Sequence, residues 1–279
     1  MDVAEANARK IFGQMHGLST TMTSFAERSN MTWPNVTLPH FDIRAKEAED
    51  LTGMELIVFS PIVTVSNKAG WEDYAWKHQD WISEDLKYHE GGEDLHPGNI
   101  TREIFTYNQY KSALGLDDGD RMLTVYDEEY YVPLWQMGPV PTNASIINID
   151  LYSNPSFHRM VNDVLEIEHK LLSEVADLDF LFNHSDVHIN DNQPRSYVLQ
   201  PVWDRFEEGA RVVGFFAGEM AWESFFINVL PEGTADVLVD VKGSCGNEFS
   251  YIVRGHHADY IGRGDLHESK YDVSSLLFD

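Results

Sequence analysis

The chain has 279 residues, of which 43% are hydrophobic and 12% aromatic, a composition typical of a globular protein rather than a disordered one. It carries 46 acidic and 20 basic side chains, a formal net charge of -26. That charge repels nucleic-acid phosphates and anionic lipid headgroups, so we expect no nucleic-acid partner and no direct adsorption to a membrane surface. The single cysteine, Cys245, excludes a disulfide framework within the chain and is expected to be a small buried hydrophobe.

The N-terminal part predicts mainly helices. Apolar residues at helical spacing indicate one long amphipathic helix over 2–29, interrupted by Gly13 and Gly17. Pro34 and Pro39 break the helical pattern. The next predicted elements are a helix, a buried strand and an aromatic-rich helix, over Ala45–Leu51, Glu55–Val63 and Lys68–Leu86.

The rest of the chain predicts strands that follow one another through turns. Tyr130–Gln136 and Ser145–Leu151 are predicted to pair, and Pro155–Phe182 has a helical period. A hairpin, a short helix and a last strand pair are predicted over Ser196–Trp203 with Arg211–Ala217, Trp222–Leu230, and Ala235–Val241 with Glu248–Val253. Because this order lacks strict βαβ alternation, it predicts an α+β fold with antiparallel sheets. A helical stalk ahead of PAS-like sheets fits the order.

Five Asn-X-Ser/Thr sequons favour passage through the secretory pathway, since about two are expected by chance. The start of the chain has no apolar leader, and the longest apolar run, which begins at Val212, is shorter than the about 20 residues of a membrane span. We therefore expect the chain to be a fragment of a longer protein. The predicted glycosylation sites are Asn30, Asn35, Asn99, Asn143 and Asn183.

An ordered series of short phrases carries a resemblance that covers nearly the whole chain. It includes WPNVTLPHFDIR (33–44), FSPIV (59–63), YVPLWQ (131–136), INID (147–150) and GDLHESKY (264–271). The series resembles the extracellular region of the receptor-type guanylate/adenylate cyclases of diatoms. More distantly, it is similar to CHASE domains, the PAS-like ectodomains of cytokinin-type receptor kinases.

The resemblance implies the sensor of a membrane receptor on the extracellular face of the plasma membrane. It implies a stalk helix over 1–29, a membrane-distal PAS-like subdomain over 30–210 and a membrane-proximal one over 211–279. It further implies a small-molecule ligand, a homodimer formed through the stalk helix, and contact with the membrane only through flanking helices. Nothing in the sequence matches a cyclase catalytic domain, so we expect no enzymatic activity and no cofactor in this chain.

Asp150 is the central residue of the predicted ligand site. It ends an otherwise apolar strand, where its carboxylate can accept hydrogen bonds from a polar ligand. The similarity to CHASE domains implies that the matching acid lies in their ligand pocket, and capping of the next helix is the alternative role. The other predicted ligand-binding residues, for each of which core packing is the alternative, are Tyr131, Trp135, Gln136, Gln200 and Trp203.

Two segments contain possible metal ligands, but neither has the pattern of a metal site. His184 and His188, followed by Asn190 and Asp191, lie in a predicted loop without an HExxH motif or paired cysteines. The acidic run 117–120 lacks the downstream bidentate glutamate of a calcium loop. We therefore predict no metal. A secreted metal-dependent hydrolase and a ligand-free structural ectodomain are the alternative functions.

Overall fold

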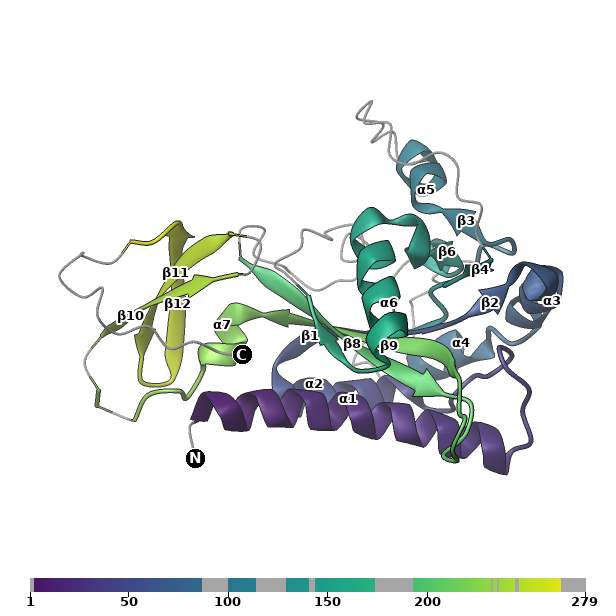
Figure 1. Ribbon diagram of the computed structural model, residues 1–279, viewed down its shortest axis with the longest axis horizontal. Coiled ribbons are helices and arrows are strands. Elements are labelled where there is room, and N and C mark those ends of the chain that lie inside the picture. The colour runs from purple at the N-terminus through teal and green to yellow at the C-terminus, as the bar shows by residue number, and fades with distance from the viewer. Residues whose placement is uncertain are drawn as a thin grey trace.

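The computed structural model describes residues 3–86, 100–113, 129–140, 144–173, 193–231, 233–234, 236–243 and 246–266. The α-helices are α1 (Val3–Arg28), α2 (Phe41–Thr52), α3 (Lys68–Lys77), α4 (Asp80–Leu86), α5 (Tyr107–Ala113), α6 (Pro155–Ile167) and α7 (Trp222–Phe226). The short 3-10 helices are η1 (Val65–Asn67), η3 (Ala144–Ile146) and η4 (Leu151–Ser153). The strands are β1 (Met54–Pro61), β2 (Val63–Thr64), β3 (Phe105–Thr106), β4 (Tyr130–Tyr131), β5 (Gln136–Gly138), β6 (Ile149–Asp150), β7 (Leu171–Leu172), β8 (Arg195–Trp203), β9 (Val212–Ala221), β10 (Val237–Lys242), β11 (Glu248–Arg254) and β12 (His257–Arg263). The protein is α+β with antiparallel sheets and a long first helix, as predicted (Figure 1).

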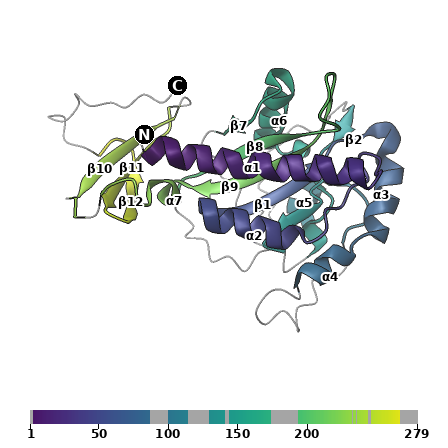
Figure 2. The ribbon, with the colours of Figure 1, turned by 90° about the horizontal axis from the view of Figure 1, so that it is seen from below.

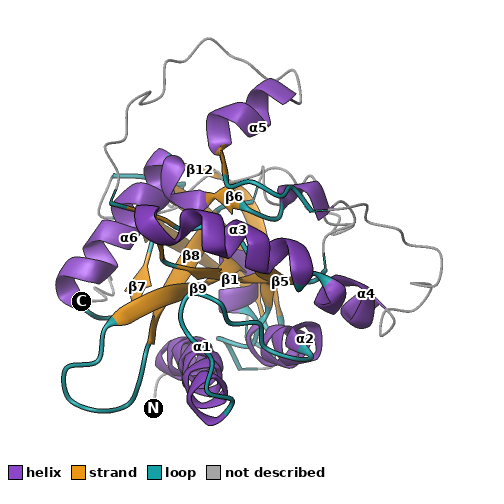
Figure 3. Cartoon of the chain, turned by 90° about the vertical axis from the view of Figure 1, so that its right-hand side faces the viewer, coloured by secondary structure: helices purple, strands orange, loops and turns teal. Residues whose placement is uncertain are grey.

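The main sheet has five strands in the order β5-β1-β9-β8-β7, and every neighbouring pair is antiparallel. Counted along the chain, its strands therefore stand in the order 2-1-5-4-3. Helices α1 and α2 cover one face and α6 covers the other (Figure 3). Because both faces of the sheet are covered, nearly every residue of the central strands β1, β8 and β9 is buried, and most of these residues are apolar.

Helix α1 packs lengthwise on the main sheet, across β8 and β9 (Figure 2). Its buried stripe includes Ile11, Met15 and Met22. The interruption predicted at Gly13 and Gly17 does not occur: the helix is continuous, and an added Cβ at either glycine would meet no atom within 4 Å. Each glycine costs about 1 kcal/mol of helix propensity, which the packing of the apolar stripe offsets.

Two buried hydroxyls hold α1 against an otherwise open part of β8. The Ser19 hydroxyl donates to the Pro201 carbonyl (2.7 Å), and the Thr23 hydroxyl donates to the Trp203 carbonyl (2.8 Å). Strand β7 pairs with β8 only as far as Leu199, so these carbonyls lie beyond the paired part of that edge. The helix thus covers a sheet edge and is fixed in one axial position on it.

We expect Ser19→Ala and Thr23→Val each to lower the free energy of unfolding by about 1 kcal/mol, because each leaves a buried carbonyl with one donor fewer. Urea denaturation of the purified chain measures the change. Thr20→Ala is the matched control, since the Thr20 hydroxyl bonds to the Gly17 carbonyl on the solvent side of the same helix. Equal effects of all three substitutions would contradict this role of the buried hydroxyls.

Helix α2 lies beside α1 on the same face of the main sheet, over β1 and β5. Two close contacts fix its position. Gly138 in β5 leaves room for the helix, because a Cβ there would lie 2.4 Å from the Cβ of Ala45. Phe41, at the start of α2, stacks on Phe216 of β9 with ring centroids 6.0 Å apart. The glycine is therefore required by packing, not by an unusual backbone conformation.

Several predicted elements differ from the structure. The strand predicted over Ser145–Leu151 is η3, the two-residue strand β6 and the start of η4. Strand β6 pairs in parallel with β3, and of the pairing predicted with Tyr130–Gln136 there is one isolated bridge, between Pro133 and Asp150. The helix predicted over Lys68–Leu86 is two helices, α3 and α4, separated at His78 and Gln79. The helix predicted to reach Phe182 ends at Ile167, where Glu168 takes a left-handed conformation (φ 54°) and the chain turns into β7. The strand predicted over Tyr130–Gln136 is split into β4 and β5, which pair with β2 and β1.

The C-terminal strands form a second, smaller sheet at one end of the molecule (Figure 1). Its order is β10-β11-β12, and β12 was not predicted from the sequence. The boundary expected between residues 210 and 211 lies in the turn of the β8–β9 hairpin, so it separates two paired strands of the main sheet. The second sheet begins only at Val237. It has a small core of its own: Phe226, Phe249, Tyr251, Val253 and Ala258.

Candidate functional site

Asp150 lies at the end of β6, where the chain turns into η4 and then α6. Its side chain is buried, with 1% of the residue exposed. Carboxyl oxygen Oδ1 accepts hydrogen bonds from the backbone N–H of Val132 (2.8 Å) and of Tyr152 (3.3 Å). The second bond makes Asp150 the N-cap of η4. Asp150 therefore has the capping role that was the alternative prediction from the sequence. Both hydrogen bonds are accepted by Oδ1 and neither by Oδ2.

Burial raises the pKa of Asp150 from its ordinary value to about 6, and the hydrogen bonds from Val132 and Tyr152 oppose part of that rise. The carboxyl forms no ion pair with any residue in the described part of the chain. A buried group that changes charge near neutral pH, and that no fixed cation stabilises, is a candidate for ligand binding.

A small hollow lies between the main sheet and α6. Asp150 does not line it, but its hydrogen-bond partner Val132 and the next residue, Leu151, do. The volume of the hollow, ≈ 10 Å³, is that of about one water molecule. The hydroxyl of Ser60, one of its lining residues, is buried and has no hydrogen-bond partner among the described residues. The other lining residues are apolar: Val132, Leu151, Phe157, Val161, Leu199, Phe215 and Ala217.

Helix α6 forms one wall of the hollow, and its sequence determines where it begins. The Asn154 side chain accepts hydrogen bonds from the backbone N–H of Ser156 (2.9 Å) and Phe157 (3.3 Å), and Pro155 occupies the first turn. This start places Phe157 over the sheet, in contact with Tyr197 of β8 (ring centroids 5.6 Å apart).

A group of aromatic hydroxyls next to Asp150 was not predicted. The Tyr152 hydroxyl donates to Asn162 Oδ1 of α6 (2.8 Å), and the Tyr130 hydroxyl donates to that of Tyr152 (3.2 Å). His158 stacks on Tyr152 with ring centroids 4.1 Å apart. Tyr152 stands two residues after Asp150, which is a usable sequence signal. No comparable sequence signal identifies Asn162, because its side chain reaches the two tyrosine hydroxyls only through the position of α6.

Trp135 and Gln136 lie in the core, with no exposed surface. Trp135 contacts Trp71 edge to face (5.2 Å between centroids), and its indole N–H donates to the Thr37 hydroxyl (3.0 Å). The Gln136 amide accepts from the Leu38 N–H (2.8 Å) and donates to the Leu38 carbonyl (3.0 Å), as a paired strand would. These hydrogen bonds hold the loop before α2 in place, and neither side chain lines the hollow.

The remaining predicted site residues, Tyr131, Gln200 and Trp203, do not line the hollow. Tyr131 is half-buried on β4, and the Lys68 ammonium lies 5.7 Å from its ring centroid. Gln200 pairs with Phe216, the residue that stacks on α2, whereas its neighbour Leu199 lines the hollow. Because successive strand residues point to opposite faces, Gln200 lies on the helix α1–α2 side. Trp203 contacts α1 through its carbonyl.

Of the predicted glycosylation sites, Asn30 is exposed just after α1, and Asn35 is half-buried. The Oδ1 atom of Asn35 is enclosed without a hydrogen-bond partner in the ranges described above, and the Thr37 hydroxyl of its sequon bonds to the Tyr74 hydroxyl (2.7 Å). Outside the described residues lie Asn99, Asn143, Asn183, Cys245, the histidine segment 184–191 and the acidic run 117–120.

The described residues contain no group of three or more His, Cys, Asp or Glu side chains placed to hold a metal ion. Among their helices, none is both long enough and apolar enough to span a bilayer. The chain matches no protein-family model, and no curated protein is significantly similar to it.

Proposed function

We propose that the chain is the extracellular ligand-sensing region of a membrane receptor, and that a small molecule binds beside Asp150, between the main sheet and α6. The observation that carries the proposal is the buried Asp150 carboxyl, which has a pKa of about 6 and accepts a hydrogen bond from Val132, a residue that lines the hollow. A ligand that donates a hydrogen bond to Oδ2 and covers apolar surface would stabilise the ionised form.

In this proposal the hollow opens when the ligand binds. A pocket for a metabolite-sized molecule has about 300 Å³ or more, so the α6 wall must move outward. The wall side chains Phe157 and Val161 are those that would separate from the sheet. The ligand then selects an open conformation that is sparsely populated without it.

Strand β8 is the proposed link between this site and α1. Leu199 lines the hollow, and two residues further along the strand the Pro201 carbonyl accepts the Ser19 hydrogen bond from α1. A displacement of β8 by the ligand would therefore change the position of α1. The antiparallel main sheet and the long first helix support the PAS-like sensor with a signalling helix that the sequence resemblance implies.

The cellular setting belongs to the same proposal. The chain lies outside the cell, carries glycans at sites such as the exposed Asn30, and pairs with a second copy through α1. Flanking sequence supplies the membrane helices and a cytosolic nucleotide cyclase, while the chain itself does not catalyse. A second candidate, a ligand-free structural ectodomain, is favoured by Trp135 and Gln136, whose side chains are fully packed.

A thermal-shift screen of the secreted chain with small polar metabolites tests the proposal. We expect at least one compound to raise Tm saturably by about 5 °C, because saturating ligand stabilises the folded state. Asp150→Asn should abolish the shift relative to its own unliganded Tm. Asp163→Asn, an exposed acid on α6, is the matched control and should retain it. If no compound stabilises the chain, the structural ectodomain is the better account.

A further inference from the structure

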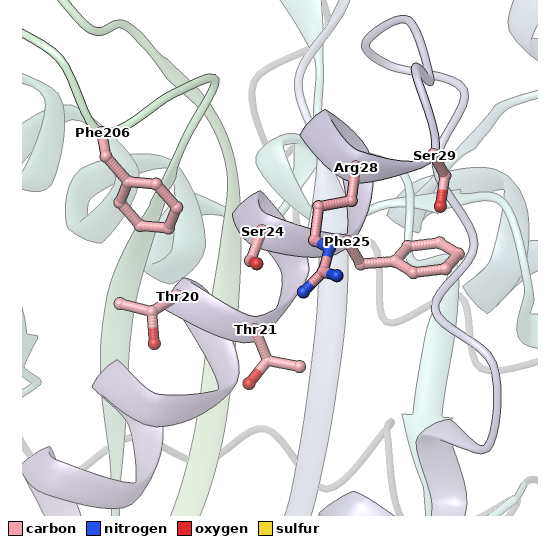
Figure 4. Close-up of a pocket in the computed structure, with 7 residues that line it drawn as sticks. All are labelled: Thr20, Thr21, Ser24, Phe25, Arg28, Ser29 and Phe206. Carbon is pink, nitrogen blue, oxygen red and sulfur yellow. The ribbon is translucent and has the colours of Figure 1, made fainter.

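An open groove of ≈ 650 Å³ lies between α1 and the β8–β9 hairpin (Figure 4). One side is the C-terminal half of α1, and the other is the turn of the β8–β9 hairpin, which carries Phe206. The groove shares no residue with the hollow between the main sheet and α6. A ligand bound in this groove would therefore contact none of the residues that line the hollow.

The groove has an aromatic side chain on each side. Phe206 is 58% exposed at the hairpin turn, and Phe25 is half-buried on α1. Figure 4 shows the two rings on opposite sides of Arg28 and Ser24. A phenylalanine that loses little surface to the protein's own core gains free energy when a ligand covers it.

The Thr20 and Thr21 hydroxyls already donate to the Gly17 carbonyl, so the donors that the groove offers a ligand include those of Arg28 and Ser24. Arg28 and Ser24 make no ion pair or side-chain hydrogen bond with any residue in the part of the chain that the structure describes. The Arg28 guanidinium offers five N–H donors in a planar fork, a geometry that fits carboxylate, sulfonate and phosphate groups.

We infer that this groove binds a soluble organic anion with an aromatic body, the acidic group on Arg28 and Ser24 and the ring against Phe206. The volume is that of a single small-molecule ligand, for which about 300–1,000 Å³ is typical. The net charge of -26 opposes any anion, so the ion pair alone holds a bare inorganic anion poorly. The apolar contact with Phe206 supplies the remainder and restricts the class to amphipathic anions.

The probe is 8-anilinonaphthalene-1-sulfonate, an aryl sulfonate whose fluorescence rises on binding, titrated into the purified chain. One saturable site is expected. Arg28→Gln and Phe206→Ser should each weaken its affinity about tenfold, since each removes a charge-assisted hydrogen bond or an apolar wall. N-phenyl-1-naphthylamine, which lacks the sulfonate, should be weakened by Phe206→Ser and not by Arg28→Gln.

Arg44→Gln and Leu51→Ser, at exposed positions on α2, are the matched controls and should leave both affinities unchanged. Circular dichroism establishes that each variant is folded. The inference is overturned if the sulfonate shows no saturable binding, or if neither Arg28→Gln nor Phe206→Ser alters it. A loss of affinity for the neutral amine on Arg28→Gln would also overturn the assignment of Arg28 to the anion.

Discussion

Replacing Arg195 with methionine is expected to lower the free energy of unfolding by about 3–5 kcal/mol, because the Glu219 carboxylate would stay buried without its cation. Arg195 Nε lies 3.2 Å from Glu219 Oε1, and the two side chains are 5% and 1% exposed. Arg195 Nε also lies 2.9 Å from Glu55 Oε2, and the Tyr197 hydroxyl donates to Glu219 Oε2 (2.5 Å). The cluster joins the three central strands β1, β9 and β8.

A double substitution distinguishes the cost of leaving the Glu219 carboxylate buried without Arg195 from the net contribution of the ion pair to stability. Arg195→Met with Glu219→Leu should recover most of the loss, because apolar replacement of a whole buried pair is close to neutral. Urea denaturation at pH 7 measures both variants. The exposed pair Arg9–Glu5 is the control, and Arg9→Met should cost less than about 0.5 kcal/mol. If the double variant is as unstable as Arg195→Met alone, the cluster stabilises the sheet by other means.

Much of the fold could be predicted because local patterns of apolar residues indicate its longer helices and strands. The apolar stripe of α1 and the mainly apolar runs of β1, β8 and β9 are visible in the sequence. The two-residue strand β7 is too short to leave a pattern. Burial alternates along β12, but its sequence hides the alternation, because the apolar Ile261 lies on the exposed face and Gly262 on the more buried one. The end of α6 depends on the left-handed Glu168, a residue type that rarely takes that conformation.

The candidate site was predictable at Asp150 and much less so around it. A lone acid that ends an apolar strand is a local signal, and in the structure its carboxyl accepts a hydrogen bond from Val132, which lines the hollow. Trp135 and Gln136 share a phrase with Tyr131, but their roles depend on Thr37 and Leu38, about a hundred residues earlier. The face on which Gln200 lies follows from strand register, which the sequence alone does not specify.

Asp150→Asn is expected to stabilise the unliganded chain by up to about 3 kcal/mol at pH 8, and the gain should vanish near pH 4. The pKa of Asp150 is about 6 in the folded chain, against an ordinary value of 3.8. That difference of about two pK units corresponds to about 3 kcal/mol. Above pH 6 the carboxylate is ionised in both states and is disfavoured by burial in the folded one. As the pH falls from about 6 to 3.8, the folded state takes up the proton first and the penalty disappears.

The asparagine keeps an Oδ1 atom for the Val132 and Tyr152 N–H groups, so the comparison isolates the charge. Urea denaturation of both proteins between pH 4 and pH 8 measures the difference. Asp163→Asn, at an exposed position on α6, is the matched control and should change the free energy of unfolding by less than about 0.5 kcal/mol. A pH-independent difference for Asp150→Asn would mean that the carboxyl is not strained by burial. The predicted pH dependence, by contrast, would mean that burying the ionised Asp150 carboxylate destabilises the folded chain. A ligand that donates a hydrogen bond to Oδ2 would remove part of that cost on binding, which connects the pH dependence of stability with the proposed function.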